Sequence, residues 1–355
     1  MTTLVPQHTP VRKLSRGSIW SLLGLSVLLA FGFFSLLLLS GAATDFNIVG
    51  AILLAVAIYV VLSFVVSRIV EGRRKANDRL ATALVTSAFV IALLPLISLV
   101  YTSVSKGLNR FDGEFFNSSM RNVVGQGGGG LHAIIGTLEI TAAATVISVP
   151  IGIMTAIYLV EYGKGRLSRA ITTLIDVMTG IPSIVAGLFA FALFAIVFGP
   201  GIRFGVGGAV ALSVLMIPVV VRSTEEMLKI VPNELREASL ALGVPKWATV
   251  VKVVLPTAIG GIITGVMIAI SRIIGETAPL LIIAGMSTSM NYNLFSDRMA
   301  TLPVFVYTQY SNQGADAQAY LDRAWTGSLV LILIVMVLNI LARILSKVLA
   351  PKGSR

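Results

Sequence analysis

Long apolar segments alternate with short polar stretches along the whole chain. Eight segments are long enough, or nearly so, to cross the hydrocarbon of a membrane as helices, which takes about 20 mostly apolar residues. They cover residues 19–40, 48–70, 80–102, 132–160, 170–198, 208–222, 257–284 and 327–349. The sixth segment is short and the fourth, fifth and seventh are long, which indicates tilt or turns outside the membrane. The pattern predicts an all-α integral membrane protein with eight spans.

The composition indicates that lipid is the main solvent of the folded chain. Hydrophobic residues make up 56% of the 355 residues and charged residues 12%, and the mean hydropathy is +0.91. A soluble globular domain has about 25% charged residues. The net charge of +11 is spread over short loops between apolar segments, so we expect no nucleic-acid partner. The chain has no cysteine, and His8 and His132 are far apart, so no metal site is expected.

The distribution of Lys and Arg predicts the orientation of the chain. If the N-terminus lies inside, 20 of the 27 basic residues fall in inner regions or at the inner ends of spans, and only Arg272 falls in the middle of a span. The six outer ones are Lys106, Arg110, Arg121, Arg203, Arg298 and Arg323. Basic residues concentrate on the cytoplasmic side of membrane proteins. The count therefore predicts that both termini lie in the cytoplasm.

Two parts follow from this arrangement of spans. Residues 1–79 are expected to form a basic tail and a two-helix hairpin that ends in the basic run EGRRKANDR. Residues 80–349 are expected to form six spans, with one polar cytoplasmic loop at 223–256. Residues 350–355 would form a short cytoplasmic tail.

The outer stretch 103–131 contains four consecutive glycines, Gly127–Gly130. A glycine run can bind phosphate groups, but this one lacks the following Lys and Ser or Thr of a P-loop. We expect a flexible connection to the next helix instead. No nucleotide-binding motif occurs elsewhere in the chain, so any ATP hydrolysis requires another subunit.

The inner loop 223–256 carries several helix start and stop signals. Residues 223–226, Ser-Thr-Glu-Glu, have the spacing of a capping box, and Pro232 suits the first turn of a helix. Gly243 can adopt the left-handed conformation that ends a helix. Pro256 marks the entry into the next span. The loop is therefore predicted to form short helices with a sharp bend beside the membrane.

One side of this loop is apolar and made of small residues. Leu235, Ala238, Ser239 and Leu242 recur at helical spacing. Small side chains at Ala238 and Ser239 would let a partner surface approach closely. The alternative is an amphipathic loop that lies on the lipid headgroups.

Two charged residues fall in the middle of the seventh span. Arg272 and Glu276 are four residues apart, so in a continuous helix they would share one face and could touch. A central Arg costs about 2.5–3.5 kcal/mol on insertion scales, so it requires a partner or water. Pro279 cannot donate to the carbonyl of Gly275, which predicts a bend. Either the two charges form a structural ion pair, or they line a path for an anion.

Three more charged residues lie in or at the ends of spans. Arg222 ends the sixth span at the inner face, where anchoring to headgroups is the ordinary role. Glu139 and Asp176 lie within spans, and we expect them to pack or to form hydrogen bonds between helices. An intramembrane enzyme would need paired carboxylates, metal ligands or a nucleophile motif, and none of these is evident.

Several motifs together resemble a known family. They are GGGGLHAIIGTLEIT, VISVPIGIMTAIYLVEYG, TGIPSIVAGLF, IPVVVRSTEEML and RIIGETAPLL, spread over about residues 80–349. The loop pattern Glu237-Ala238-Ser239, then Gly243, then Leu255-Pro256 is similar to the EAA loop of permeases in ATP-binding-cassette (ABC) importers. Ser239 replaces the second Ala of that pattern. In combination these motifs resemble the PstA-type permeases of bacterial ABC phosphate importers.

The resemblance implies a six-helix, MetI-like core of the type I ABC importers, preceded here by the hairpin of residues 1–79. It implies that Arg272, Glu276 and Arg222 line the translocation path. It also implies that the loop couples to an ATPase through Glu237, Ala238, Ser239, Gly243, Leu255 and Pro256.

The resemblance further implies a set of partners in the bacterial cell membrane. They are a PstC-like permease subunit that forms a heterodimer with this chain, an ABC ATPase dimer, an extracytoplasmic phosphate-binding protein and membrane lipid. The chain itself would be no enzyme and bind no cofactor, because ATP and Mg would be used on the partner ATPase. The hairpin departs from the six-span pattern, and it could pack outside the core, bind lipid or substitute for helices of a partner.

Two alternative functions stay open. The first is an ABC importer for another oxyanion, namely sulfate, molybdate or a phosphonate, because the loop pattern does not distinguish these substrates. The second is a secondary transporter that works without an ATPase, against which the cytoplasmic loop argues.

Overall fold

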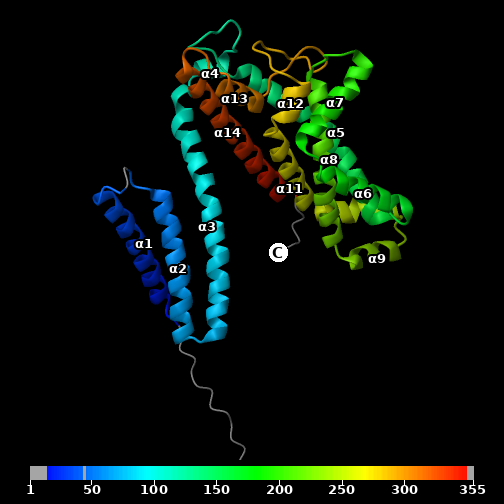
Figure 1. Cartoon of the computed structure of the whole chain (residues 1–355). Coiled ribbons are helices and arrows are strands. Elements are labelled where there is room, and N and C mark those ends of the chain that lie inside the picture. Colours follow the sequence, from blue (N-terminus) through cyan, green and yellow to red (C-terminus); the bar gives the residue numbers. More distant parts are fainter. Residues whose placement is uncertain (1–13, 43–44, 350–355) are drawn as a thin grey trace, which may run out of the picture. The chain divides into compact units, whose positions relative to one another are not determined.

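The computed structural model describes residues 14–42 and 45–349 (Figure 1). The expected basic tail at 1–13, with His8, and the tail at 350–355 lie outside the described residues. Within the described ranges every regular element is a helix, as predicted. Contacts divide the chain into two compact units, Met1–Tyr101 and Thr102–Arg355. The functional boundary after residue 79 stays a prediction.

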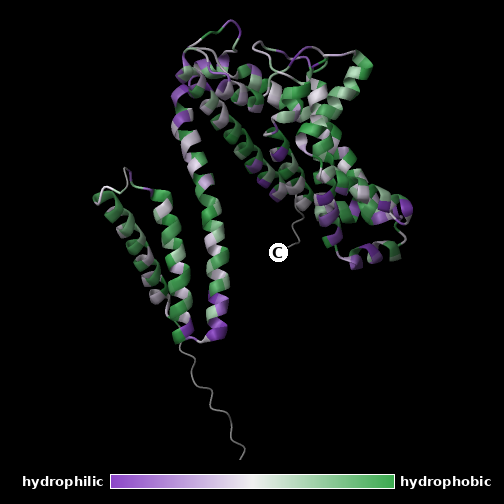
Figure 2. Ribbon diagram, viewed as in Figure 1, coloured by the Kyte–Doolittle hydropathy of each residue, from purple (hydrophilic) through white to green (hydrophobic). Residues whose placement is uncertain are grey.

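The first unit is built from α1 (Arg16–Leu39), α2 (Ile48–Val70) and most of α3 (Arg73–Gly107). Helices α1 and α2 pack on each other over their length. Their close approach depends on Gly50, because a Cβ there would meet the ring of Phe34 at 2.7 Å. Figure 2 shows that hydrophobic residues dominate the three helices, while hydrophilic residues gather where α2 meets α3.

Glu71 holds the corner between α2 and α3. Its carboxylate accepts hydrogen bonds from Arg79 (Nη2–Oε1 2.9 Å), from the hydroxyl of Ser67 (2.8 Å) and from the backbone N–H of Leu14 (2.8 Å). The hydrogen bond from Arg79 is the main reason why the pKa of Glu71 falls from about 4.5 to about 2. Gly72, with φ of +88°, makes the turn itself.

The second unit contains the rest of the chain. Its long helices are α5 (Leu131–Ile157), α6 (Arg166–Thr179), α7 (Ser183–Phe198), α8 (Gly205–Ile230), α11 (Leu255–Ile274) and α14 (Ala317–Leu349). The short elements are η1 (Leu108–Arg110), α4 (Gly113–Asn117), η2 (Tyr158–Tyr162), α9 (Asn233–Ala241), α10 (Lys246–Thr249), η3 (Val250–Val254), α12 (Ala278–Ile283) and α13 (Leu302–Ser311). Helix α8 is central, because it packs against α5, α7 and α11.

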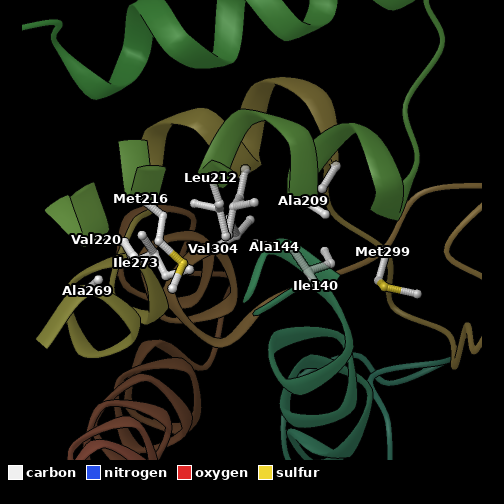
Figure 3. Close-up of a cluster of buried hydrophobic side chains, with 12 residues drawn as sticks. Ile140, Ala144, Ala209, Leu212, Met216, Val220, Ala269, Ile273, Met299 and Val304 are labelled. Atoms are coloured by element: carbon white, nitrogen blue, oxygen red, sulfur yellow. The ribbon is translucent and has the colours of Figure 1, made fainter. Parts of the chain in front are cut away.

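The core of this unit lies where α5, α8 and α11 meet (Figure 3). Ile140 of α5, Leu212 and Met216 of α8 and Ile273 of α11 are almost fully buried and point toward one another. In lipid, apolar residues gain little by leaving the solvent, so helices associate mainly through close van der Waals packing. Gly136 of α5 illustrates this, because a Cβ there would lie 2.1 Å from the backbone oxygen of Ala300.

The structure has seven to eight candidate spans, compared with the eight that were predicted. Seven helices of the described residues are long and apolar enough to cross a membrane, and there are eight if the bent pair α6–α7 counts as one span. The second span, at 48–70, coincides with α2. The orientation with both termini inside stays a prediction.

The fifth predicted segment, 170–198, is not one continuous helix. It consists of the last part of α6 and the whole of α7, which meet at an angle of 109°. The break lies at Gly180–Pro182. The residue before a proline avoids the helical conformation, and proline itself cannot donate to the preceding turn. The helix therefore stops and restarts at this point.

The capping box predicted at 223–226 is wrong. Helix α8 continues through these residues to Ile230. The side chain of Glu225 bonds Arg222 and Lys229 of the same helix, so it stabilises the helix interior instead of a new N-terminus.

The glycine run before α5 is held in place by hydrogen bonds, which corrects the expectation of a flexible connection. The carbonyls of Gly125 and Gly127 accept hydrogen bonds from Arg323, at 2.6 and 3.0 Å. The N–H of Gly128 donates to Glu114 at 2.9 Å. Arg323 is fully buried in α14, so these glycine carbonyls supply two of the partners that a buried guanidinium requires.

Candidate functional site

Arg272 lies in the last turn of α11, with an exposed side chain. Helix α11 ends at Ile274, and Glu276 lies in the following turn, half-buried. The predicted shared helix face of these two residues is therefore wrong, and no ion pair joins them. Within the described part of the chain, neither side chain has a hydrogen-bond or salt-bridge partner.

The chain restarts as α12 directly after this turn. Pro279 lies in the first turn of α12, where its missing N–H breaks no hydrogen bond, so the span is broken at Gly275 and not merely bent. Pro279 is held by Gly187 of α7, where a Cβ would come within 2.5 Å of the Pro279 Cα. Gly207 of α8 contacts Ile283 in the same way. Helix α12, which directly follows the turn that carries Glu276, is thus packed closely against α7 and α8.

Arg222 belongs to a charge network and is no free anchor for headgroups. Its guanidinium bonds the carboxylate of Asp176 in α6 and that of Glu225 one turn further along α8 (Nη1–Oε2 3.0 Å). Glu225 also accepts from Lys229 at 2.6 Å. The expectation that Asp176 bonds between helices is confirmed. The cluster has two positive and two negative groups and is therefore balanced.

The network includes a residue that sequence reasoning missed. Glu225 has only a tenth of its side chain exposed and bonds two cations. The signal was present in the sequence, because Arg222 and Glu225 have the i, i+3 spacing of helix neighbours. It was overlooked because a helix start was assigned to these residues.

Arg222 and Arg272 lie at different levels of one helix pair. Gly265 of α11 packs on Ser223 of α8, where a Cβ would meet the hydroxyl oxygen at 2.5 Å. Arg272 follows Gly265 by seven residues, which is two turns or about 10 Å along the helix. The structure therefore places the paired Arg222 beside the contact and the unpaired Arg272 two turns away from it.

The predicted short helices with a sharp bend are confirmed. Helix α9 follows Pro232, Gly243 adopts a φ of +76°, and α10 follows. Glu237, Ala238 and Gly243 are exposed.

Ser239 does not face a partner. It is buried and shares a hydrogen bond with the hydroxyl of Thr249 (2.9 Å), because the helix turns this side of α9 toward α10. Leu255 and Pro256 stand at the start of α11, within one continuous helical run from Lys246 to Ile274. They belong to the base of the span and not to the bend.

A buried ion pair braces the bend against α5. Arg236 of α9 donates from Nε and Nη2 to Glu161 at 2.9 and 2.8 Å, and to the backbone carbonyls of Val231 and Leu228. Glu161 lies in η2, at the end of α5, with 7% of its side chain exposed. Sequence reasoning did not find this pair, because its members are far apart in the chain.

The outer side of the bend exposes large apolar residues. Leu242 is 84% and Trp247 63% exposed, and Leu235 and Leu240 are also exposed. Glu237 and Ala238, which are also exposed, lie between Leu235 and Leu240 in the sequence. Apolar residues with charged neighbours are typical of surfaces that contact another protein.

Residues 148–355 match the model of the family described as "Binding-protein-dependent transport system inner membrane component". The chain belongs to this family. It is a multi-pass inner-membrane protein and a transport permease component, not an enzyme in its own right.

Curated relatives show which permeases of this family the chain resembles. The chain is 44% identical over 282 residues to "Phosphate transport system permease protein PstA 1" of Mycobacterium tuberculosis (strain CDC 1551 / Oshkosh), covering 78% of this chain and 91% of the relative. It is 38% identical over 281 residues to the PstA protein of Yersinia pestis, covering 78% and 92%. The resemblance to PstA-type permeases that the motifs indicated is confirmed.

Solved structures agree on the fold. The chain is similar to a subunit of the inward-facing MetNI methionine ABC transporter, with a TM-score of 0.50 and 20% identity over 61% of this chain and 94% of that one. It is also similar to a chain of a bacterial ABC transporter that imports alginate, with a TM-score of 0.51 and 13% identity over 76% and 96%. The MetI-like fold is therefore confirmed.

The ion pair between Arg236 and Glu161 yields a prediction about the bend that begins with α9. Arg236→Gln leaves Glu161 buried without its cation, and breaking a buried pair costs about 3–5 kcal/mol. We expect amide hydrogens of residues 233–241 to exchange faster in the variant, measured by mass spectrometry on the purified protein. Lys252→Gln, which removes an exposed cation of the same loop, is the control. Equal exchange in Arg236→Gln and the wild type would contradict the brace.

Proposed function

We propose that this chain is the permease subunit of an ATP-driven importer of inorganic phosphate and forms half of its translocation path. The observation that carries the proposal is the 44% identity to a phosphate permease over 91% of that relative's length. The chemistry of the site supports it, because the broken span presents a cation, Arg272, that has no partner within residues 14–42 and 45–349. The other components would be a PstC-like permease, a pair of ABC ATPase subunits and an extracytoplasmic phosphate-binding protein.

Arg272 is the residue best suited to meet the anion. Phosphate is strongly hydrated and cannot enter lipid unaided, so its path must offer polar groups. Arg272 is exposed and unpaired among the described residues, whereas Arg222 is neutralised by Asp176 and Glu225. Glu276, four residues further on, would limit the strength of anion binding. A transport site must bind an ion well enough to admit it and weakly enough to release it.

Arg222 would act at a second level of the same path. Its guanidinium donates hydrogen bonds to two carboxylates, so an arriving anion would compete with Asp176 and Glu225 for it. Movement of α6 relative to α8 would change this competition. The two arginines therefore support a path in which an anion meets Arg272 directly, the open level. At Arg222, the gated level, the anion must first compete with the carboxylates of Asp176 and Glu225.

The bend at α9 is suited to transmit the work of an ATPase. Ser239 and Thr249 join α9 to the helical run that begins at Lys246, and this run continues to Ile274, beside Arg272. Arg236 joins the same bend to the end of α5. ATP and Mg would be bound by the partner ATPase. A force on α9 would thus move α5 and α11 together, and with them the level of Arg272.

The substrate is tested by uptake of radiolabelled phosphate in cells that lack this chain. Restoring the chain should restore uptake, and excess sulfate or molybdate should leave it unchanged. Uptake that does not depend on the chain, or that another oxyanion blocks, would contradict phosphate as the substrate while leaving the family membership intact.

Arg272→Gln tests the path. Loss of a hydrogen bond to a charged group costs about 1.5–3 kcal/mol, so phosphate uptake should fall by roughly 10- to 100-fold while the assembled complex still purifies. Arg121→Gln removes an exposed outer cation and should leave uptake unchanged. A variant that no longer assembles would indicate a structural role for Arg272 instead.

Gly243→Val tests the coupling. A β-branched residue at a φ of +76° is strained by about 1–3 kcal/mol, so the bend should shift and phosphate uptake should be lost although ATP is still hydrolysed. Gly201→Val places the same strain in a glycine with a φ of +83° on the predicted outer side, and is the control. Unchanged uptake in Gly243→Val would refute the coupling assignment.

A further inference from the structure

A long groove lies between the three helices of the first unit. It has a volume of about 430 Å³. Helices α1 and α2 pack closely, but α3 buries little of its surface, so a gap remains along one side of the pair. On α1 the groove extends from Ile19 to Phe31, and on α3 from Arg79 to Val90.

The groove follows the length of the helices. From Ile19 to Phe31 it extends over about 18 Å of α1. An extended hydrocarbon chain suits this length and the apolar lining.

The lining of the groove is apolar in effect. Leu23, Val27, Ile52, Val56 and other aliphatic side chains form most of it. Half of its hydroxyl groups form hydrogen bonds within their own helices.

Three of these hydroxyl groups donate to backbone carbonyls. Ser26 donates to Leu22 at 2.8 Å, Ser63 to Val60 at 3.1 Å, and Thr82 to Asp78 at 2.9 Å. These three hydroxyl groups therefore add little polarity to the mainly aliphatic lining.

One end of the groove is positively charged. Arg79 closes this end, with Nε and Nη2 held by Glu71, and Lys75 and Asp78 line a second, shallower depression beside it. Arg73 and Arg74 are exposed on the same turn of α3 and have no ion-pair partner among the described residues. Since Arg79 is neutralised by Glu71, and Asp78 offsets one cation, the corner keeps a positive excess.

The position of this charge selects the ligand. Lys and Arg distribution predicts that the corner lies at the cytoplasmic surface, where anionic lipids attract basic residues by about 1 kcal/mol each. Figure 2 shows hydrophilic residues at this end of α3 and hydrophobic residues along the helices above it. The groove thus combines a basic end, which attracts a negatively charged headgroup, with an apolar length, which accommodates an acyl chain.

We propose that the groove binds one anionic glycerophospholipid, with an acyl chain between α1, α2 and α3 and the phosphate beside Lys75. The bound lipid fills the space that α3 leaves open and so fixes α3 against the α1–α2 pair. The first unit is then a lipid-binding module, a role that does not depend on the transported substrate.

The test uses the purified transporter complex in nanodiscs made of equal parts phosphatidylglycerol and phosphatidylcholine. Native mass spectrometry of the released complex should show retained phosphatidylglycerol in excess of phosphatidylcholine. Ala83→Phe fills the groove from its buried lining and should abolish this retention. Ala81→Phe adds the same ring to an exposed position of α3 outside the groove and should retain the lipid.

The basic end is tested by charge removal. Lys75→Gln should lower the preference for phosphatidylglycerol about fivefold, as loss of one cation near an anionic lipid implies. Lys164→Gln, an exposed cation of another inner loop, should not change it. Equal retention of both lipids by the wild type, or equal loss in Ala81→Phe and Ala83→Phe, would overturn the proposal.

A second measurement does not depend on the folding of the Ala83 variant. A photoreactive amino acid in place of Ser87, which lines the groove, should form an adduct with phosphatidylglycerol. An adduct with a peptide of another subunit would overturn the proposal, because a protein helix would then occupy the space.

Discussion

The arrangement of the second unit depends on how closely other elements can approach α8. In a membrane the hydrophobic effect does not drive helices together, so small residues at the contacts decide which helices pair. Gly152 of α5 meets Val220, Gly265 of α11 meets Ser223, and Gly207 of α8 itself meets Ile283 of α12. Adding one methyl group at any of these glycines would place carbon within 2.7 Å of a neighbour. The backbone distances set by these contacts determine where the charged residues lie.

The charges within the spans differ in how they are compensated. Arg222, Lys229, Asp176 and Glu225 neutralise one another, and such a cluster can remain at the end of a span without a ligand. Arg272 has no such compensation among the described residues. An uncompensated cation in a span is costly unless water, an anion or another subunit meets it. This contrast is the physical basis for assigning the open level of the path to Arg272.

Much of the fold could be predicted from periodicity and composition. The spans are long and uniform enough that α2 was predicted at its observed bounds, and the bend at Gly243 followed from the one residue type that adopts a positive φ without strain. Predictions failed where a local signal had two possible outcomes. Pro279 could bend or break its helix, and Glu225 could cap a new helix or stabilise an existing one. Packing against α7 and the charges of Arg222 and Lys229 made the choice.

Hydropathy, the positions of Lys and Arg and the loop motif, all readable in the chain itself, were sufficient for the class of protein and its family. These properties depend on residue type and short-range spacing. The pairing of Arg236 with Glu161 and of Arg222 with Asp176, the isolation of Arg272 and the groove beside α3 could not be obtained in this way. They join residues that are distant in sequence, and their geometry is fixed by which helices pack closely and which are kept apart.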